Sequence, residues 1–163
     1  MSLNRIIAWL SFALVAMTCA VGYAQVTEVV VRQNDIIEWQ GVSGPAHVVQ
    51  FGGTVSGVTL TTPKQAQEIF TFDPQTPLLP NGLSKESGSN GKLLLKATVK
   101  AATPVNTTFR FACGNHPSQM LSIPFRVEAA GASPQTHIIK GVSGLHWKLE
   151  KSPTEDIHVD TTP

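Results

Sequence analysis

Three side chains that can bind a metal ion lie close together in the segment Cys113-Gly-Asn-His116-Pro-Ser-Gln-Met120. A thiolate, an imidazole and a thioether are soft or borderline donors, and they suit a copper ion that alternates between one and two positive charges. Such an ion is held by two histidines and one cysteine in a trigonal set, with a weak axial methionine. The segment supplies one histidine. We expect the second to be His47, which lies in a run, Pro45 to Phe51, that is typical of a strand.

The N-terminus has the pattern of a cleaved secretory signal, which we assign to residues 1–24. Arg5 precedes the apolar run Ile6 to Val21, and small residues end the segment at Ala24. The protein is therefore expected to be exported, to the periplasm or outside the cell. The apolar run has about 16 residues, whereas a spanning helix needs about 20, so we expect no stable membrane span after cleavage. The alternative is an uncleaved signal that keeps the protein at the membrane.

Cysteine content favours a metal-binding role for Cys113. The chain has two cysteines, and Cys19 lies inside the expected signal, so the exported protein keeps Cys113 alone. An unpaired thiol is unusual in an oxidising compartment. It can be buried and inert or form an intermolecular disulfide, but the neighbouring His116 and Met120 favour metal binding. Zinc, which gains little from a methionine, and an empty site are the alternatives to copper, and the alternative for Met120 alone is packing.

Charge argues against nucleic acid as a partner. The full chain has 12 basic and 11 acidic residues, and removal of the signal takes Arg5 and no acidic residue, which leaves 11 of each. Phosphate binding needs a basic stripe or patch, and the sequence has none. The roughly 140 residues that remain suffice for one domain with a hydrophobic core.

Short β-segments separated by turn residues fill most of this chain, and no amphipathic helix is evident. The expected strands are 26–32, 36–40, 47–51, 55–60, 68–72, 92–100, 107–113 and 123–129. This pattern predicts an all-β fold, an antiparallel sandwich or barrel of seven or eight strands.

The expected strand 107–113 carries the cysteine. A period of two places its phenylalanines and Cys113 on one face, so the thiol continues a column of core side chains. The turn that follows is long enough to bring His116 and Met120 back to the thiol.

Residues 73–91 form a long loop rich in proline, glycine and serine. Because it has no ligand chemistry, we expect a solvated insertion. The tetrapeptide Gly-Val-Ser-Gly occurs twice, at 41–44 and at 141–144. Four small residues can match by chance, so this is not treated as a repeat.

Residues 131–163 form an expected C-terminal extension. Within it, 145–149 alternates in the manner of an edge strand. The extension contains His137, His146 and His158, which have no recognised metal-ligand spacing. We expect these histidines to be solvated rather than to form a second metal site.

By these features the chain resembles the cupredoxins, the small blue-copper proteins that include plastocyanin, pseudoazurin and amicyanin. The resemblance covers about Val26 to Ala130, so we assign residues 25–130 to a cupredoxin-like domain. It is carried by Asn34-Asp-Ile-Ile-Glu-Trp39, by His47 in a strand and by the Cys-x2-His-x3-Met loop. It implies a Greek-key β-sandwich or barrel and one type 1 copper ion bound by His47, Cys113, His116 and Met120.

The sequence departs from the family in three respects. The spacing of Met120, with three residues between it and His116, falls between those of the short-loop and the longer-loop members. Val48 follows His47, where plastocyanins often have an asparagine that braces the cysteine loop, so the sequence does not show what braces this loop. The disulfide that is usual in azurins and plant phytocyanins cannot form with one cysteine in the exported chain.

The resemblance implies an electron carrier and not an enzyme: a protein that moves single electrons between redox partners outside the cytoplasm. It implies His116 as the electron exit, inside an apolar patch that Pro45, Pro117, Leu121 and Pro124 could supply. A redox donor and acceptor would contact this patch transiently, and the protein would be a monomer. An oxidase is disfavoured, because no His-x-His or His-Cys-His pair exists for further copper centres. The alternatives are an envelope copper-binding or delivery protein with the same ligands, aided by the histidines of the extension, and an interaction module that has lost redox work.

Overall fold

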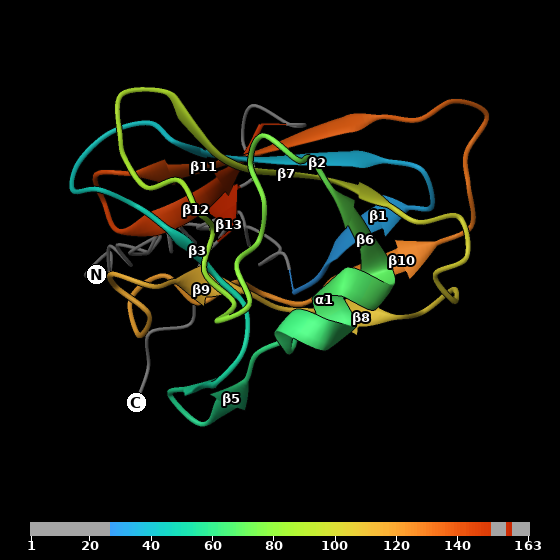
Figure 1. Cartoon of the computed structure of the whole chain (residues 1–163), viewed down its shortest axis with the longest axis horizontal. Helices are drawn as coiled ribbons and strands as arrows, with labels where there is room; N and C mark the ends of the chain where they lie inside the picture. Colours follow the sequence, from blue (N-terminus) through green and yellow to red (C-terminus); the bar gives the residue numbers. More distant parts are fainter. Residues whose placement is uncertain (1–26, 151–155, 158–163) are drawn as a thin grey trace, which may run out of the picture.

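The structure, a computed structural model, describes residues 27–150 and 156–157, and the expected signal at 1–24 lies outside them. In the described part the fold is all-β apart from one short helix (Figure 1). The elements, in chain order, are β1 (Val29–Arg32), β2 (Ile36–Gly41), β3 (Val49–Gln50), β4 (Thr54–Val55), β5 (Val58–Thr59), α1 (Pro63–Ile69), β6 (Phe70–Phe72), β7 (Lys92–Val99), β8 (Thr108–Phe109), β9 (Ala112–Cys113), β10 (Phe125–Glu128), β11 (Thr136–Val142), β12 (His146–Leu149) and β13 (Asp156–Ile157).

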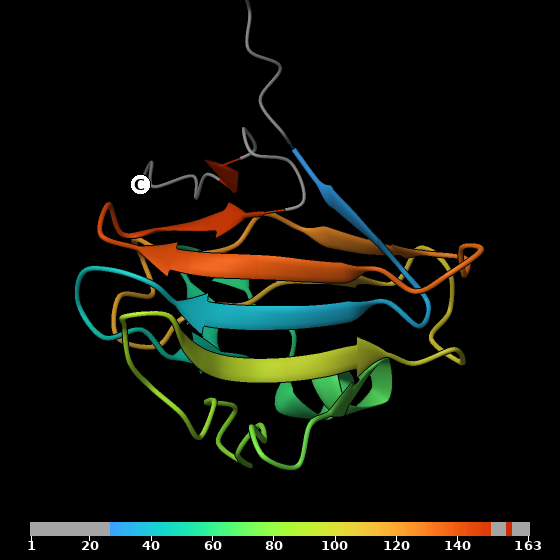
Figure 2. The same cartoon turned by 90° about the horizontal axis from the view of Figure 1, so that it is seen from above.

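Most of these strands belong to two sheets. The larger sheet has the order β13-β12-β11-β2-β7-β6, and Figure 2 looks onto its face. Within it, β2 is antiparallel to β7 and parallel to β11. The smaller sheet has the order β1-β10-β8, and the pairs β3–β9 and β4–β5 stand apart from both. The all-β class predicted from the sequence is therefore confirmed.

The hydrophobic core is built around Trp39 of β2. Its ring meets those of Phe51, Phe70 and Phe111 edge-on, with centroids 5.4–6.2 Å apart. All four side chains are buried. Edge-to-face pairs of this kind add about 0.5–1.5 kcal/mol each beyond the burial of their surface. Phe111 lies two residues before Cys113 in the chain, and both side chains are buried in the same core.

The run predicted as one strand at 107–113 is divided between two sheets. β8 pairs with β10, whereas β9 pairs with β3. Between them, the amides of Arg110 and Phe111 donate to the hydroxyls of Thr61 and Ser122, both at 2.9 Å. These side chains satisfy backbone donors that a continuous strand would have paired with its neighbour. The predicted inward face is confirmed, because both phenylalanines and the cysteine are buried.

The strand predicted at 68–72 is wrong in its first half, which belongs to helix α1. Thr62 caps this helix: its hydroxyl accepts from the Gln65 amide at 3.2 Å, and the Gln65 side chain accepts from the Thr62 amide at 2.9 Å. This capping box, with Pro63 in the first turn, is a helix-start signal that the sequence contained. Ala66 and Ile69 bury the inner face of the helix.

The described part of the C-terminal extension folds together with the rest. β11 pairs with β2 along most of its length, and Trp147 and Leu149 of β12 belong to the hydrophobic core. The strand predicted at 145–149 is thus confirmed in its main part, but it is not an edge strand, because β12 lies between β11 and β13. His137 was expected to be solvated, which is wrong: it is buried, with Nε2 2.7 Å from Oδ2 of Asp35. His158 lies outside the described residues.

Candidate metal centre

Three of the four predicted ligands come together at one end of the molecule. One ligand atom each from His47, Cys113 and His116 can be chosen so that all lie within 4.8 Å of one another. The Sγ atom of Cys113 is 3.9 Å from Nδ1 of His47 and also 3.9 Å from Nδ1 of His116. His47 and Cys113 are fully buried and His116 is half-buried.

The two sulfur–nitrogen distances are compatible with one metal ion bound by all three side chains. An ion about 2.3 Å from sulfur and about 2.0–2.1 Å from nitrogen separates the two donors by about 3.8 Å in a trigonal plane, and by about 3.6 Å in a tetrahedron. Both observed separations, 3.9 Å, lie within a few tenths of an ångström of these values. A thiolate with two imidazoles is also a donor set that copper prefers.

His47 is held by its backbone and by its ring. Its amide donates to the Gly88 carbonyl and its carbonyl accepts from the Gly88 amide, both at 2.9 Å. Ring atom Nε2 lies 3.1 Å from the carbonyl oxygen of Ser43. A carbonyl can only accept, so Nε2 carries the proton and the lone pair of Nδ1 faces Cys113. The ring therefore has the tautomer that a metal ligand needs.

The 73–91 loop braces the His47 segment, and the expectation of a solvated insertion is wrong for this part of it. Ser84 exchanges two hydrogen bonds with Val49: its hydroxyl accepts from the Val49 amide at 3.0 Å, and its own amide donates to the Val49 carbonyl at 2.8 Å. The Phe51 amide donates to the Gly82 carbonyl at 2.7 Å. Ser84 is only 3% exposed. The loop thus takes the place of a neighbouring strand, although it has no ligand chemistry.

The cysteine loop curls back on itself by backbone hydrogen bonds. The His116 amide donates to the Cys113 carbonyl at 3.1 Å, the Met120 amide donates to the His116 carbonyl at 2.9 Å, and the Cys113 amide donates to the Met120 carbonyl at 3.1 Å. These bonds place the main chain of Met120, whose side chain is fully buried, beside Cys113. The axial role of its thioether stays a prediction.

Asn115 supplies a brace that the sequence did not show. Its side-chain Nδ2 donates to the carbonyl of Ala46 at 2.7 Å, which ties the cysteine loop to the residue before His47. A second tie is the Gly114 amide, which donates to the Val48 carbonyl at 2.9 Å. Asn115 therefore braces the two segments from within the cysteine loop. Its position between Cys113 and His116 is the signal by which the sequence could have suggested this role.

No family model and no curated protein matches this chain. In the described ranges, no helix has the length and apolar character that crossing a bilayer requires. The candidate metal centre is therefore interpreted from its own geometry.

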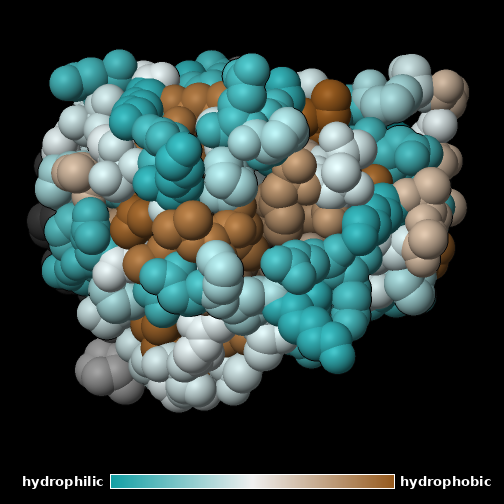
Figure 3. Space-filling model, viewed as in Figure 1, coloured by the Kyte–Doolittle hydropathy of each residue, from teal (hydrophilic) through white to brown (hydrophobic). Residues whose placement is uncertain are grey.

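The surface beside the candidate metal centre is partly apolar. Pro45 is exposed and Pro117 is half-buried, but Leu121 is only 5% exposed, so the expectation that Leu121 contributes to a surface patch is wrong. Figure 3 shows apolar surface where Figure 1 has β3, β9 and the 73–91 loop. Leu79 and Leu83 of that loop are half-buried. An apolar contact area thus lies along the segments that hold the ligands.

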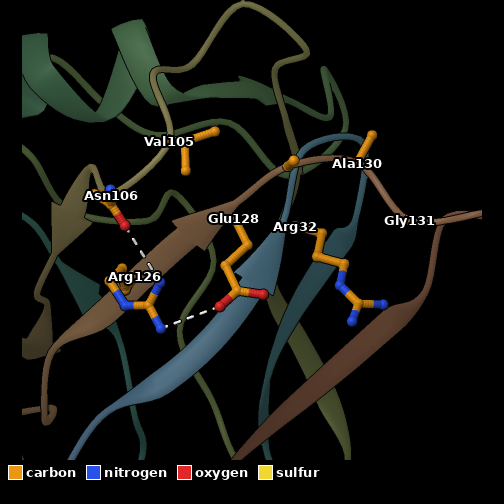
Figure 4. A pocket seen from close by; sticks show the side chains of 8 residues that line it. Arg32, Val105, Asn106, Arg126, Glu128, Ala130 and Gly131 are labelled. Carbon is orange, nitrogen blue, oxygen red and sulfur yellow. Dashed lines mark hydrogen bonds and ion pairs between the residues drawn. The ribbon is translucent and has the colours of Figure 1, made fainter.

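An open hollow of about 560 Å³ lies at the other end of β2, beyond the end of β1 (Figure 4). Arg32 and Arg126 line it, but Arg126 is already paired with Glu28 at 2.8 Å and with Glu128 at 3.1 Å. Exposed Asn106 also lines it. The hollow has no thiol, imidazole or thioether in its lining, so it does not offer the donors that copper prefers.

Proposed function

We propose that the protein is a type 1 copper protein of the cupredoxin kind, which carries single electrons between redox partners outside the cytoplasm. The observation that carries this proposal is the buried thiol of Cys113 placed 3.9 Å from an imidazole nitrogen on each of two histidines. His47, Cys113 and His116 would be the three strong ligands, and Met120 the weak axial one. Copper, when bound, would supply a one-electron couple.

The protein's part is to keep this geometry fixed. Cys113 lies on β9, which pairs with β3, and His47 is held by a two-way backbone bridge to Gly88. Ligands on such rigid supports move little between oxidation states, so little reorganisation opposes electron transfer. Burial of Cys113 and His47 excludes water, and half-buried His116 gives the electron a short path to the surface.

The fold supports the same proposal. Two main sheets enclose the core, and the cysteine loop connects β9 to β10 at one end of them. We infer the Greek-key cupredoxin topology from this arrangement together with the order of the ligands along the chain.

Copper delivery is less well supported than electron transfer. That alternative uses the histidines of the extension to pass the ion on, but buried His137 is engaged with Asp35 at the far end of the sheet. A carrier must keep its metal through each redox cycle, whereas a delivery protein must release it. Repeated reduction and oxidation of the copper-loaded protein in the presence of a copper(I) chelator separates the two. We expect the copper to stay bound and the couple to be reversible; loss of copper to the chelator on reduction would contradict an electron carrier.

A further inference from the structure

The two Gly-Val-Ser-Gly segments, which the sequence left as a chance match, lie side by side in the structure. β11 runs parallel to β2, and Gly141 is the register partner of Gly41. The Val42 amide donates to the Gly141 carbonyl at 2.8 Å, and the Ser143 amide donates to Oγ of Ser43 at 3.1 Å. The two segments therefore form one paired unit at the end of the sheet that carries the candidate metal centre.

This paired unit contacts the ring of His47. The Ser43 carbonyl accepts from Nε2 of the ring. A Cβ atom added at Gly141 would lie 2.8 Å from Cγ of His47, so the ring packs directly on the glycine backbone. A Cβ atom added at Gly41 would lie 2.0 Å from the Gly88 carbonyl oxygen, the acceptor of the His47 amide. Gly41 and Gly141, the first residues of the two segments, thus leave space beside His47 and Gly88 that a larger side chain would occupy.

Trp147 of β12 completes the support. It is the register partner of Gly141 on the opposite side from β2, and it is fully buried. Its ring centroid is 6.0 Å from that of His47. Its indole Nε1 donates to the carbonyl of Met120 at 2.8 Å. One side chain therefore contacts one predicted ligand and holds the backbone of another.

We propose that Trp147, together with the paired Gly-Val-Ser-Gly segments, is the positioning device of the metal centre. It fixes the plane of the His47 imidazole and the position of Met120 relative to Cys113, and so sets the geometry in which the ion is held. This inference rests on the proposed function. Groups that orient metal ligands typically change metal affinity about 10- to 100-fold when they are removed.

The test is Trp147→Phe in the full chain, with Trp39→Phe as a matched control. Both tryptophans are fully buried in the same core, but the ring of Trp39 contacts Phe51, Phe70 and Phe111, and none of these is a predicted ligand. We expect both variants to lose stability. Only Trp147→Phe should lower copper(II) affinity, by about tenfold, and change the intensity ratio of the visible bands and the copper hyperfine splitting.

A second pair of variants covers the case in which Trp147→Phe does not fold. Gly141→Ala pushes directly on the His47 ring, with Cβ 2.8 Å from Cγ. At Gly131 an added Cβ would meet the flexible side chain of Arg32 at 3.1 Å and the Ser133 carbonyl oxygen at 3.7 Å. We expect an altered copper spectrum for Gly141→Ala and an unchanged one for Gly131→Ala. A third measurement needs no variant: the indole N–H resonance of Trp147 should shift when diamagnetic copper(I) is added, and that of Trp39 should not.

The outcomes separate this inference from the proposed function. A wild-type protein with no thiolate-to-copper band overturns both. A wild-type protein with that band, together with spectra for Trp147→Phe and Gly141→Ala that equal those of their controls, overturns the positioning role alone.

Discussion

Two buried histidines stand at opposite ends of the six-stranded sheet and are held in different ways. His47 lies where β2 and β11 end, and its Nε2 donates to a neutral carbonyl, which leaves Nδ1 facing a thiol. His137 lies where these strands begin, and its Nε2 faces the Asp35 carboxylate at 2.7 Å. Both side chains are 0% exposed. Burial alone therefore does not distinguish a metal ligand from a structural histidine, whereas the partner of each ring nitrogen does.

At the other end of the sheet, the buried Asp35 carboxylate is held by several hydrogen bonds. Burial raises the pKa of the Asp35 carboxyl, but hydrogen bonds from the Gln135 amide, from His137 and from the Arg32 amide outweigh it and hold the pKa below its ordinary value. The carboxylate is thus ionised and joins β2 to the chain that enters β11.

The largest expected effect comes from a chain that ends at Ala130. It lacks β11 and β12, and with them His137, Gly141 and Trp147. We expect this chain not to fold, because β2 loses its hydrogen-bonded neighbour and the core loses a buried tryptophan. Circular dichroism and thermal unfolding would show it, with a chain ending at Ile157 as the folded control. A truncated chain that folds and binds copper as before would show that the extension is needed neither at the His137 end of the sheet nor at the His47 end.

A smaller effect, confined to the His137 end, is expected for Asp35→Asn. The Asp35 carboxylate accepts hydrogen bonds from the Arg32 and Gln135 amides and faces the His137 ring, so we expect its replacement to lower the free energy of unfolding by about 3 kcal/mol. The copper spectrum should not change. Glu38→Gln, which breaks a more exposed pair with Lys96, is the control and should cost at most about 1 kcal/mol. A changed spectrum in Asp35→Asn would show that the two ends are coupled.

The pH dependence of that loss gives a further prediction. A carboxyl whose pKa is lowered by folding stabilises the protein above its unfolded-state pKa, and this stabilisation is lost as the pH falls through the folded-state pKa. The difference in unfolding free energy between the wild type and Asp35→Asn should therefore be constant near neutral pH and shrink below about pH 4. Urea unfolding at several pH values measures it. A difference that grows on acidification would contradict the lowered pKa.

The smallest effect is expected at the end that carries the candidate metal centre, for Asn115→Ala. It removes the hydrogen bond to the Ala46 carbonyl and should cost about 1 kcal/mol or less in stability. Because the bond ties the two ligand segments together, copper affinity should fall by up to about tenfold. Asn81→Ala is the control, since Oδ1 of Asn81 accepts a hydrogen bond from the amide of Leu83 within its own loop. Equal copper affinities in the two variants would show that Asn115 does not position the ligands.

The parts of the fold that could be predicted are those that rest on local pattern. Alternation placed Cys113 on the core face, and the ligand chemistry of the cysteine loop and of His47 needed only residue types and spacing. The helix at Pro63–Ile69 was missed although its capping signal was present, because the phenylalanines that follow it gave a stronger strand signal.

The parts that could not be predicted depend on pairing between distant segments. The role of Ser84 follows from hydrogen bonds with Val49, 35 residues away. The role of Gly141 follows from its register with Gly41, and that of Trp147 follows from its hydrogen bond to the Met120 carbonyl. Neither composition nor periodicity contains such pairings. The supports of the candidate site are therefore visible only in the structure, whereas the candidate ligands could be proposed from the sequence.

The most direct test of the central claim is the visible absorption and paramagnetic resonance spectrum of the copper(II)-loaded protein, measured beside Cys113→Ser. We expect an intense thiolate-to-copper band and a narrow copper hyperfine splitting in the wild type, both absent from Cys113→Ser. A colourless protein, or an ordinary tetragonal copper spectrum that is the same with and without the thiol, would contradict the account.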